Sequence, residues 1–356
     1  MGLATGNVLD RYVIEGLLGS GSMGRVYRAT DTRLRRSVAL KVLEGTTAGL
    51  DTAMALREAR AAAAIVHPNV TAIFDADHNG GTSFIVMELV PGTPLRQLVG
   101  DDTVPISTRI RWLIEIAAAL SAAHQAGVVH RDIKPENVIV REDGMVKVLD
   151  FGIARFATTA TPAVGMHFVG GPTEQTSLAG TPAYMAPEQI QGEVVDGRAD
   201  QFAWGVVAYE VLSGKLPWNS SNGPLGLLAS IVNDTPPPLP EHVPLDVVAV
   251  VMRALSKSRD ARFPSIVEAA TALAPHSSGP LPLLGLAPDS STRTRAREPR
   301  PQLSPRDPAT QPPPSRTRVA PLAYSVTPPP VTAPPSRLPR ASRRRSAPSR
   351  LRRCAR

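Results

Sequence analysis

A glycine-rich turn between two strand-like segments is the feature that most restricts the fold of this 356-residue chain. The turn holds Gly19, Gly21 and Gly24, so backbone N–H groups can approach phosphate oxygens without an intervening Cβ. Tyr12 to Leu18 precedes it, and residues 25–30 follow with the alternation typical of a strand. A dinucleotide-binding fold needs a helix directly after the glycines. We therefore expect a β-hairpin, which taken alone is either a flap over phosphates or an ordinary glycine turn. The sequence contains no G-x-x-x-x-G-K-[ST] P-loop.

The rest of the N-terminal region alternates strands with one helix. We expect strands at 38–43, 70–74 and 83–87 and an alanine-rich helix at 51–66. Pro68 ends that helix, because proline disfavours helical geometry in the residue before it. The region therefore comprises about five strands and one helix.

Helical patterns dominate after residue 87. We expect a helix from a Ser107 cap to Gly127, a strongly apolar and buried helix over 199–212, and two more over 247–255 and 266–273, the last with Ser265 and Glu268 at capping-box spacing. A small hairpin over 138–149 turns at Asp143-Gly144. A strand-rich region is thus followed by a larger helical one.

The composition changes at residue 275. The segment 275–356 holds 19 of the 36 prolines and 16 arginines but no lysine, so it contributes the excess of positive charge, and residues 1–274 carry a net charge of −5. Such a segment buries too little apolar surface to offset its ordering entropy, and we expect it to be disordered. An out-of-frame reading of GC-rich DNA would give a similar composition. A solvated tail is favoured over nucleic-acid binding, because Tyr324 is its one aromatic residue.

Cysteine content and hydropathy exclude two further classes. Cys354 is the one cysteine, which excludes a disulfide framework and a multi-cysteine metal site. The apolar runs are far shorter than the ~18 residues that span a bilayer, and the chain opens without a signal-peptide pattern. We expect no transmembrane segment and a cytoplasmic location.

Lys41 lies inside the apolar run 38–43, where an unpaired charge is costly to bury. A lysine at a sheet edge, facing solvent, is the alternative. Glu58 on the following helix and a phosphate group are the two partners that the sequence offers. A lysine–glutamate pair beside a glycine turn would hold phosphate oxygens.

The segment His130-Arg-Asp132-Ile-Lys134-Pro-Glu-Asn137 places Asp132 and Asn137 five residues apart in a loop interrupted by proline. Asp150 precedes a Phe-Gly pair at the end of a predicted strand. The Asp150 carboxylate and the Asn137 amide oxygen are hard ligands that suit Mg²⁺ rather than zinc. Asp132 then remains to accept a proton from an incoming hydroxyl. Taken alone, each fragment is more typical of a solvated acidic turn.

Taken in order, these motifs resemble the signature of the eukaryotic-like (Hanks-type) protein kinases, above all the bacterial serine/threonine kinases of actinobacteria. The matching elements are Gly19 to Val26, Val38 to Lys41, Glu58, His130 to Asn137, Asp150 to Gly152 and Ala186 to Glu188. The resemblance implies an α+β, bilobal protein kinase fold over residues 12–274. Its parts are a small antiparallel β-sheet lobe with one helix at about 12–87, a hinge at 88–91 and a large, mainly helical lobe at about 92–274, before the disordered tail at 275–356.

The resemblance implies nucleotide-binding roles in the smaller lobe. Phosphates would lie under the glycine turn, which comprises Leu18, Gly19, Ser20, Gly21, Ser22, Met23, Gly24, Arg25 and Val26. Val26 and Ala39 would enclose the adenine, with Met87 as gatekeeper and the segment Glu88 to Val90 as hinge. Lys41 would bind the α- and β-phosphates while paired with Glu58.

It also implies the catalytic and metal roles in the larger lobe. Asp132 would be the catalytic base and Lys134 would steady the γ-phosphate. Asn137 and Asp150 would hold Mg²⁺, with Mn²⁺ as the alternative ion.

Four further residues would support that machinery. Glu188 would pair with Arg262, and Asp200 would anchor the backbone of the catalytic loop. His130 is expected to pack against its neighbours rather than to exchange protons.

We therefore expect an ATP-dependent protein serine/threonine kinase that phosphorylates Ser/Thr-bearing proteins and itself. Autophosphorylation at Thr173 or Thr176 is expected to order the activation loop through Arg131. A homodimer is one compatible state, and no specific nucleic-acid partner is expected. Two alternatives from other classes are a pseudokinase scaffold, disfavoured because the lysine, base and metal ligands are all present, and an adaptor that binds nucleic acid or membrane through its tail.

Overall fold

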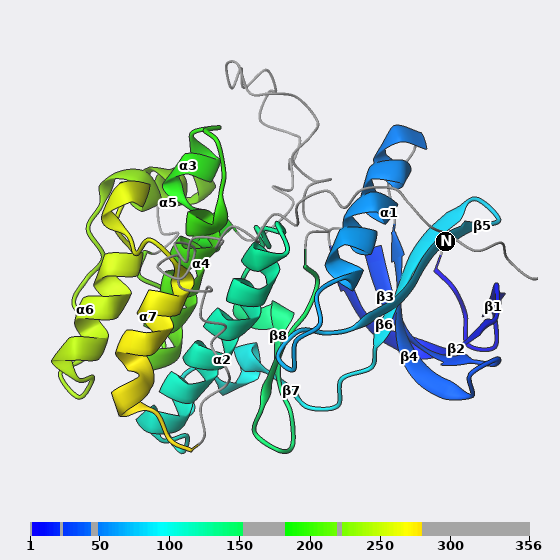
Figure 1. Ribbon diagram of the computed structural model, residues 1–356, viewed down its shortest axis with the longest axis horizontal. Helices are drawn as coiled ribbons and strands as arrows, with labels where there is room; N and C mark the ends of the chain where they lie inside the picture. The colour runs from blue at the N-terminus through cyan, green and yellow to red at the C-terminus, as the bar shows by residue number, and fades with distance from the viewer. Residues whose placement is uncertain (1, 22–23, 44–48, 152–181, 219–222, 280–356) are drawn as a thin grey trace, which may run out of the picture. The chain divides into compact units, whose positions relative to one another are not determined.

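The structure, a computed structural model, describes residues 2–21, 24–43, 49–151, 182–218 and 223–279 (Figure 1). The chain divides into a unit of residues 1–294 and a second unit of residues 295–356, and all described residues belong to the first. The disorder expected for the tail lies outside the described residues from residue 280 on. Just before that point, the Ser278 N–H still donates to the Ser107 carbonyl oxygen (3.2 Å).

Six antiparallel strands form one sheet, in the order β1-β2-β3-β4-β6-β5. They are β1 (Val8–Leu9), β2 (Tyr12–Gly21), β3 (Gly24–Asp31), β4 (Arg36–Leu43), β5 (Ile73–Asn79) and β6 (Thr82–Glu88). The side chains of β4 alternate between two apolar clusters: Val38, Leu40 and Val42 pack on one side. Ala39 and Leu43 pack on the other, with Ala59 of helix α1 (Gly49–Ala63). The expected small antiparallel sheet with one helix is confirmed.

The segment between α1 and β5 differs from the prediction. Helix α1 ends at Ala63, and β5 begins at Ile73, so the strand predicted at 70–74 is largely wrong. Val70 instead forms an isolated parallel bridge with Val148. The segment is buried, so its apolar residues resemble a strand. Asn69 and Thr71 exchange backbone hydrogen bonds with Val148, and the Ala72 carbonyl oxygen accepts from Glu88 of β6.

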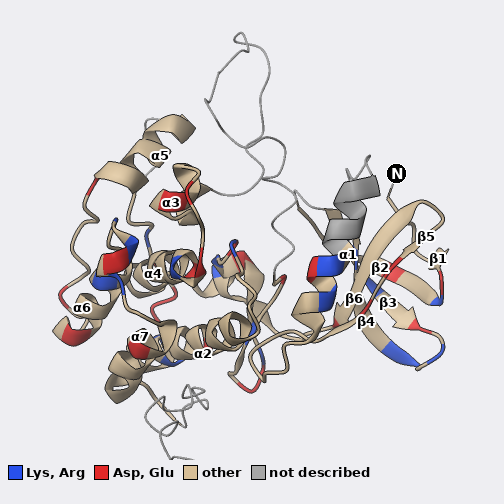
Figure 2. Ribbon diagram, turned by 45° about the horizontal axis from the view of Figure 1, so that its top comes forward, with Lys and Arg blue, Asp and Glu red and all other residues tan. Residues whose placement is uncertain are grey.

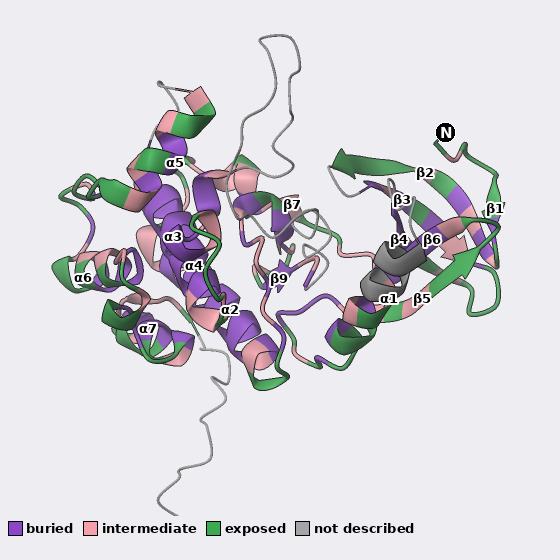
Figure 3. Ribbon diagram, turned by 90° about the horizontal axis from the view of Figure 1, so that it is seen from above, coloured by how far each residue is buried: buried purple, intermediate pink, exposed green. Residues whose placement is uncertain are grey.

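Helices dominate the rest of the described chain. They are α2 (Ile106–Gln125), α3 (Pro187–Ile190), α4 (Gly197–Ser213), α5 (Gly223–Asn233), α6 (Leu245–Ala254) and α7 (Ile266–Leu273), with short 3₁₀ turns η1 (Leu95–Leu98), η2 (Pro135–Asn137), η4 (Pro182–Tyr184), η5 (Arg259–Ala261) and η6 (Ala274–His276). Figure 3 shows α4 and much of α2 in the purple of buried residues, as the apolar sequence of 199–212 predicts. No helix among the described residues is long and apolar enough to cross a membrane.

Two features of these helices escape the sequence patterns. Helix α5 was not predicted; it carries no charged residue (Figure 2), so its short sequence has no polar face to reveal a helical period. The predicted Ser107 cap is wrong, because α2 begins at Ile106 after Pro105. Ser265 does occupy the cap position of α7, but its side chain makes no capping hydrogen bond.

A second, three-stranded sheet contains the hairpin that separates Asp132 from Asp150 in the sequence. It comprises β7 (Thr93–Pro94), β8 (Val138–Val140) and β9 (Val146–Val148). The hairpin of β8 and β9 is confirmed, and β7 is an addition. Gly92 precedes β7 with φ +153°, and a Cβ there would lie 2.4 Å from the Val140 carbonyl oxygen. Only glycine therefore lets the chain approach β8 at this point.

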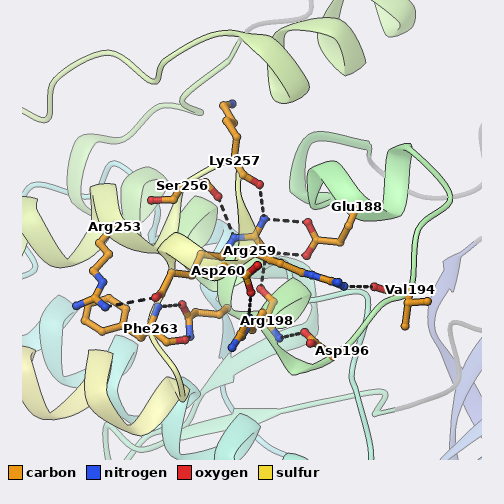
Figure 4. A network of polar contacts seen from close by, with 12 residues as sticks. Glu188, Val194, Asp196, Arg198, Arg253, Ser256, Lys257, Arg259, Asp260 and Phe263 are labelled. Carbon is orange, nitrogen blue, oxygen red and sulfur yellow. Dashed lines mark hydrogen bonds and ion pairs between the residues drawn. The ribbon is translucent and has the colours of Figure 1, made fainter.

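The buried Arg262 hydrogen-bonds to several of the residues that Figure 4 labels, among them Glu188 and Lys257. The Arg262 guanidinium donates to both carboxylate oxygens of Glu188, at 2.6 and 2.8 Å. It also donates to the carbonyl oxygens of Ser256, Lys257 and Arg198. The expected Glu188–Arg262 pair is thus present, and its charges are compensated within the buried site.

We predict that Arg262→Met lowers the free energy of unfolding by about 3–5 kcal/mol, because Glu188 would stay buried without its counter-charge. Urea unfolding measures this loss. Arg198→Met is the matched control, because the Arg198 side chain pairs with Asp260, which is 80% exposed. It should cost less than about 1 kcal/mol. Equal losses in the two variants would contradict the prediction.

Candidate active site

Lys41 lies on the β4 face that carries Ala39 and Leu43, with a side chain only 5% exposed. Its Nζ donates to Asp150 Oδ2 at 2.7 Å. The expected pair with Glu58 of α1 is not among the ion pairs that join described residues; the structure gives Lys41 a different partner. A buried amine needs a counter-charge, and the carboxylate after β9 supplies it.

Asp150 lies two residues after the end of β9, and its backbone is held in an unusual conformation. Its φ of +58° lies in the left-handed region, which costs a non-glycine residue energy unless the surroundings impose it. The preceding residue, Leu149, donates its N–H to the Asn137 carbonyl oxygen (2.8 Å), and its own carbonyl oxygen contacts His130 Nε2 (2.8 Å). The ring of Phe151 packs edge-on against the His130 ring, with centroids 4.6 Å apart. His130 therefore packs, as expected, and fixes both neighbours of Asp150.

Asp132, Lys134 and Asn137 converge at the start of η2. Asp132 Oδ2 accepts from Lys134 Nζ at 2.7 Å and from Asn137 Nδ2 at 3.0 Å. Asn137 Nδ2 also donates to the Asp132 carbonyl oxygen (2.8 Å). The Asp132 carboxylate remains 31% exposed, so it is oriented by two donors and still accessible.

Asp200 of α4 binds the backbone of the segment that directly precedes Asp132. Its carboxylate accepts the backbone N–H of His130 at 2.8 Å and that of Arg131 at 2.7 Å. Arg131 has φ +68°, and this bond helps to keep it there. His124 Nε2 lies 2.7 Å from the same carboxylate. The predicted anchoring of the loop by Asp200 is present.

The charge of Asp200 is stabilised although the residue is fully buried. Burial alone would raise the pKa of this carboxyl. The hydrogen bond with His124, its attraction to His124 and His130, and the Arg131 N–H outweigh that effect, and the pKa lies below its ordinary value. Asp200 is therefore a carboxylate that accepts hydrogen bonds at neutral pH.

The predicted adenine-binding residues share one apolar cluster. Ala39 and Met87 are both buried, and Val26 packs against them. A small cavity of about 10 Å³ lies beside Met87 and Asp150, lined also by Thr71. The Thr71 hydroxyl is buried, and no described residue forms a hydrogen bond with it. The cavity has about the volume that one water molecule requires.

Glu88, predicted in the hinge, has a side-chain partner that the sequence analysis missed. Lys147 of β9 donates to Glu88 Oε2 (2.8 Å) and to the Val70 carbonyl oxygen (3.1 Å). The Glu88 backbone N–H donates to the Ala72 carbonyl oxygen (2.8 Å). The sequence contained a signal for this ion pair, because Lys147, like Lys41, is a lysine inside an apolar run, and both are buried.

The glycine turn is described in part. Leu18, Gly19, Ser20 and Gly21 are exposed at the end of β2, and Gly24, Arg25 and Val26 begin β3. A Cβ added at Gly19 or Gly21 would meet no atom within 4 Å, so this end of the hairpin is open. Ser22, Met23, Gly152, Thr173 and Thr176 lie outside the described residues.

The donor set at this site fits a divalent ion that is bound together with phosphates. Asn137 uses its amide nitrogen on Asp132, which leaves its oxygen for an ion, and the Asp150 carboxylate is 24% exposed. Among the described residues, no group of three or more His, Cys, Asp or Glu side chains could hold a metal by itself. Mg²⁺ commonly takes one or two protein ligands, with substrate phosphates and waters completing the shell.

We predict that Asp200→Asn lowers the free energy of unfolding by about 3 kcal/mol, because one amide oxygen cannot serve two backbone N–H groups and His124. The wild-type carboxylate contributes stability above pH ~4, the range in which the unfolded carboxyl is ionised, and that contribution is lost as the pH falls. The variant should therefore lose less stability than the wild type on acidification, measured by urea unfolding at several pH values. Asp102→Asn, at an exposed position, is the control. A variant that unfolds with the wild-type pH dependence would refute the role of Asp200.

Comparison with known proteins agrees with this arrangement. A family model described as protein kinase domain matches residues 12–270. Serine/threonine-protein kinase PknB of Mycolicibacterium smegmatis is 38% identical over 271 residues, which cover 73% of this chain and 42% of that protein. A probable PknB of Corynebacterium glutamicum is 35% identical over 286 residues, 75% of this chain and 42% of its own. The chain thus spans less than half the length of these relatives.

A solved structure shows the same fold. The crystal structure of the Mycobacterium tuberculosis PknI kinase domain superimposes with a TM-score of 0.59 at 28% sequence identity. The match covers 78% of this chain and 100% of the PknI chain. The motifs, the fold and these matches lead to one assignment: the chain belongs to the protein kinase family, among the Hanks-type bacterial serine/threonine kinases.

Proposed function

We propose that this chain transfers the γ-phosphate of ATP to serine or threonine hydroxyls of proteins. The observation that carries the proposal is the oriented, accessible carboxylate of Asp132. Two donors, Lys134 and Asn137, fix Oδ2, and the residue is 31% exposed. A carboxylate held in this way can receive the proton of an incoming hydroxyl.

The charged residues around Asp132 suit a phosphoryl transfer. Its transition state is loose and strongly anionic, so the protein must mainly position groups and neutralise charge. Lys134, 2.7 Å from the base, would place positive charge beside the transferred group. Lys41, buried on β4, would bind the α- and β-phosphates. No covalent nucleophile is required.

Asn137 and Asp150 would hold Mg²⁺, with Mn²⁺ as the alternative ion. When bound, the ion would neutralise charge that develops on the phosphate oxygens. The protein contributes the position of these ligands: Asn137 is fixed by Asp132, and Asp150 by the contacts of its neighbours with His130. Asp150 would remain within reach of Lys41.

The pseudokinase alternative has less support. A binding scaffold does not need an accessible base with two donors on one oxygen, nor a buried lysine paired with a metal-ligand carboxylate. Here the partly exposed Asp132 carboxylate accepts from two donors on one oxygen, and the buried Lys41 pairs with the Asp150 carboxylate, which supports the catalytic proposal. The adaptor alternative rests on the tail, which lies outside the described residues beyond residue 279.

We predict that Asp132→Asn lowers kcat about 10²–10⁴-fold, the usual contribution of a general base. The full chain is incubated with labelled ATP, Mg²⁺ and a threonine-bearing protein, and the label on protein is counted. Asp143→Asn is the matched control, because Asp143 lies at the exposed turn of the β8–β9 hairpin. Full activity of Asp132→Asn would remove the proposed base, and an inactive wild type would remove the proposed reaction.

Autophosphorylation at Thr173 or Thr176, acting through Arg131, is the proposed regulation. A phosphate carries close to two negative charges and pairs well with arginine. We predict that Thr173→Ala/Thr176→Ala lowers activity at least ~10-fold and removes the phosphate that mass spectrometry detects in this segment. Thr103→Ala is the control, since Thr103 is exposed outside this segment. Undiminished activity of the double variant would refute the proposal.

A further inference from the structure

Arg96 of η1 lies at the centre of a cluster of side chains from three other elements. Its Nε donates to Glu136 Oε1 of η2 at 2.8 Å, and its Nη1 to Glu210 Oε1 of α4 at 2.5 Å. Its Nη2 donates to the hydroxyl of Tyr184 in η4, and that hydroxyl donates to Glu210 Oε2 at 2.6 Å. We name these four residues the guanidinium cluster. The kinase motifs do not include Arg96.

The cluster is buried at one end and open at the other. The Glu210 side chain is 5% exposed, whereas those of Arg96 and Glu136 are 35% and 43% exposed. Burial, together with the bond to Glu210, raises the pKa of Tyr184, so its hydroxyl stays protonated. Burial alone would lower the pKa of Arg96, but the bonds with both glutamates outweigh it and raise that pKa. Arg96 is therefore always charged, and both carboxylates of the cluster compensate its charge.

Its position along the chain brings the cluster close to the proposed base. Glu136 follows Asp132 by four residues, which span at most about 14 Å and less across a 3₁₀ turn. Tyr184 lies in η4, four residues before Glu188. A side chain within about four positions of the acceptor residue of a bound substrate can therefore reach the cluster.

Without Arg96, the remaining groups would form a complementary site for one guanidinium. Two carboxylates and a phenol oxygen would face a single cavity, and the planar fork of an arginine matches such an arrangement better than the point charge of a lysine. In the wild-type chain this site is filled by the protein's own residue.

We propose that Arg96 is a specificity-determining residue: it closes an arginine site next to the catalytic loop, so that the enzyme does not select substrates with an arginine near the acceptor. This inference rests on the proposed kinase function. A purely structural role for Arg96 would predict that its loss slows phosphorylation of all substrates alike.

The test compares threonine peptides that differ only in arginine or citrulline at positions one to four before the acceptor. Citrulline has nearly the same shape as arginine but no charge. For the full-length wild type, we expect kcat/KM for each pair to agree within about twofold. Arg96→Ala should raise the arginine-to-citrulline ratio by about 10- to 100-fold at one position, as expected for a hydrogen bond between charged groups. A general loss of stability would leave this ratio unchanged.

Two further variants check the assignment. Glu136→Gln, added to Arg96→Ala, should reduce the ratio by at least about threefold, because one carboxylate is lost. Arg141→Ala is the matched control, because it also removes one positive charge. Arg141 is 36% exposed, pairs with the exposed Asp143 and is not part of the guanidinium cluster.

A second readout does not depend on activity or on the alanine variant. Arg96→Met keeps the apolar stem that covers its neighbours, and its melting temperature should rise with the arginine peptide but not with the citrulline peptide. The inference is overturned if the wild type itself prefers arginine peptides. It is equally overturned if Arg96→Met shows no such shift and active Arg96→Ala no change in ratio. A wild type that phosphorylates neither peptide nor protein would count against the proposed function, and the melting temperatures would still decide the inference.

Discussion

A buried carboxylate that accepts two consecutive backbone N–H groups is the interaction on which the rest of the site depends. Asp200 fixes His130 and Arg131 from inside α4. Because Arg131 is thereby held at φ +68°, the chain direction at Asp132 is set by the backbone rather than by the carboxylate's own contacts. Removing water from a carboxylate is costly, and here N–H donors and a nearby histidine offset that cost.

His130 connects the backbone that Asp200 binds with the residues that follow β9. This residue touches the Leu149 carbonyl oxygen and the Phe151 ring, and so encloses Asp150 on both sides. Asp150 in turn neutralises Lys41 on β4. Five contacts thus join α4, the loop that contains Asp132, the hairpin and the large sheet. Each charge in this series has an opposite charge or a backbone dipole beside it, which is why a buried lysine is tolerated.

The sequence predicted local features well and partner choice poorly. Strand alternation placed β3, and an apolar run with a lysine inside it placed β4 and identified Lys41, because both signals depend on neighbouring residues only. The partner of Lys41 could not be read in this way, since Glu58 and Asp150 are both carboxylates and only the three-dimensional arrangement distinguishes them. The bridge of Val70 to Val148 and the cluster around Arg96 depend in the same way on segments far apart in the chain.

The hydrogen bonds of Asp200 and Arg262 go mainly to backbone groups, whereas those of the guanidinium cluster join side chains. Asp200 and Arg262 act largely on backbone groups, which no substitution of the partner can remove, so few residues can replace them. Arg96, Glu136, Tyr184 and Glu210 contact one another through side chains alone. A change in any one of these can be compensated by a change in another. The backbone-directed bonds therefore fix the geometry of the proposed active site, and the side-chain cluster beside it can change and leave that geometry intact.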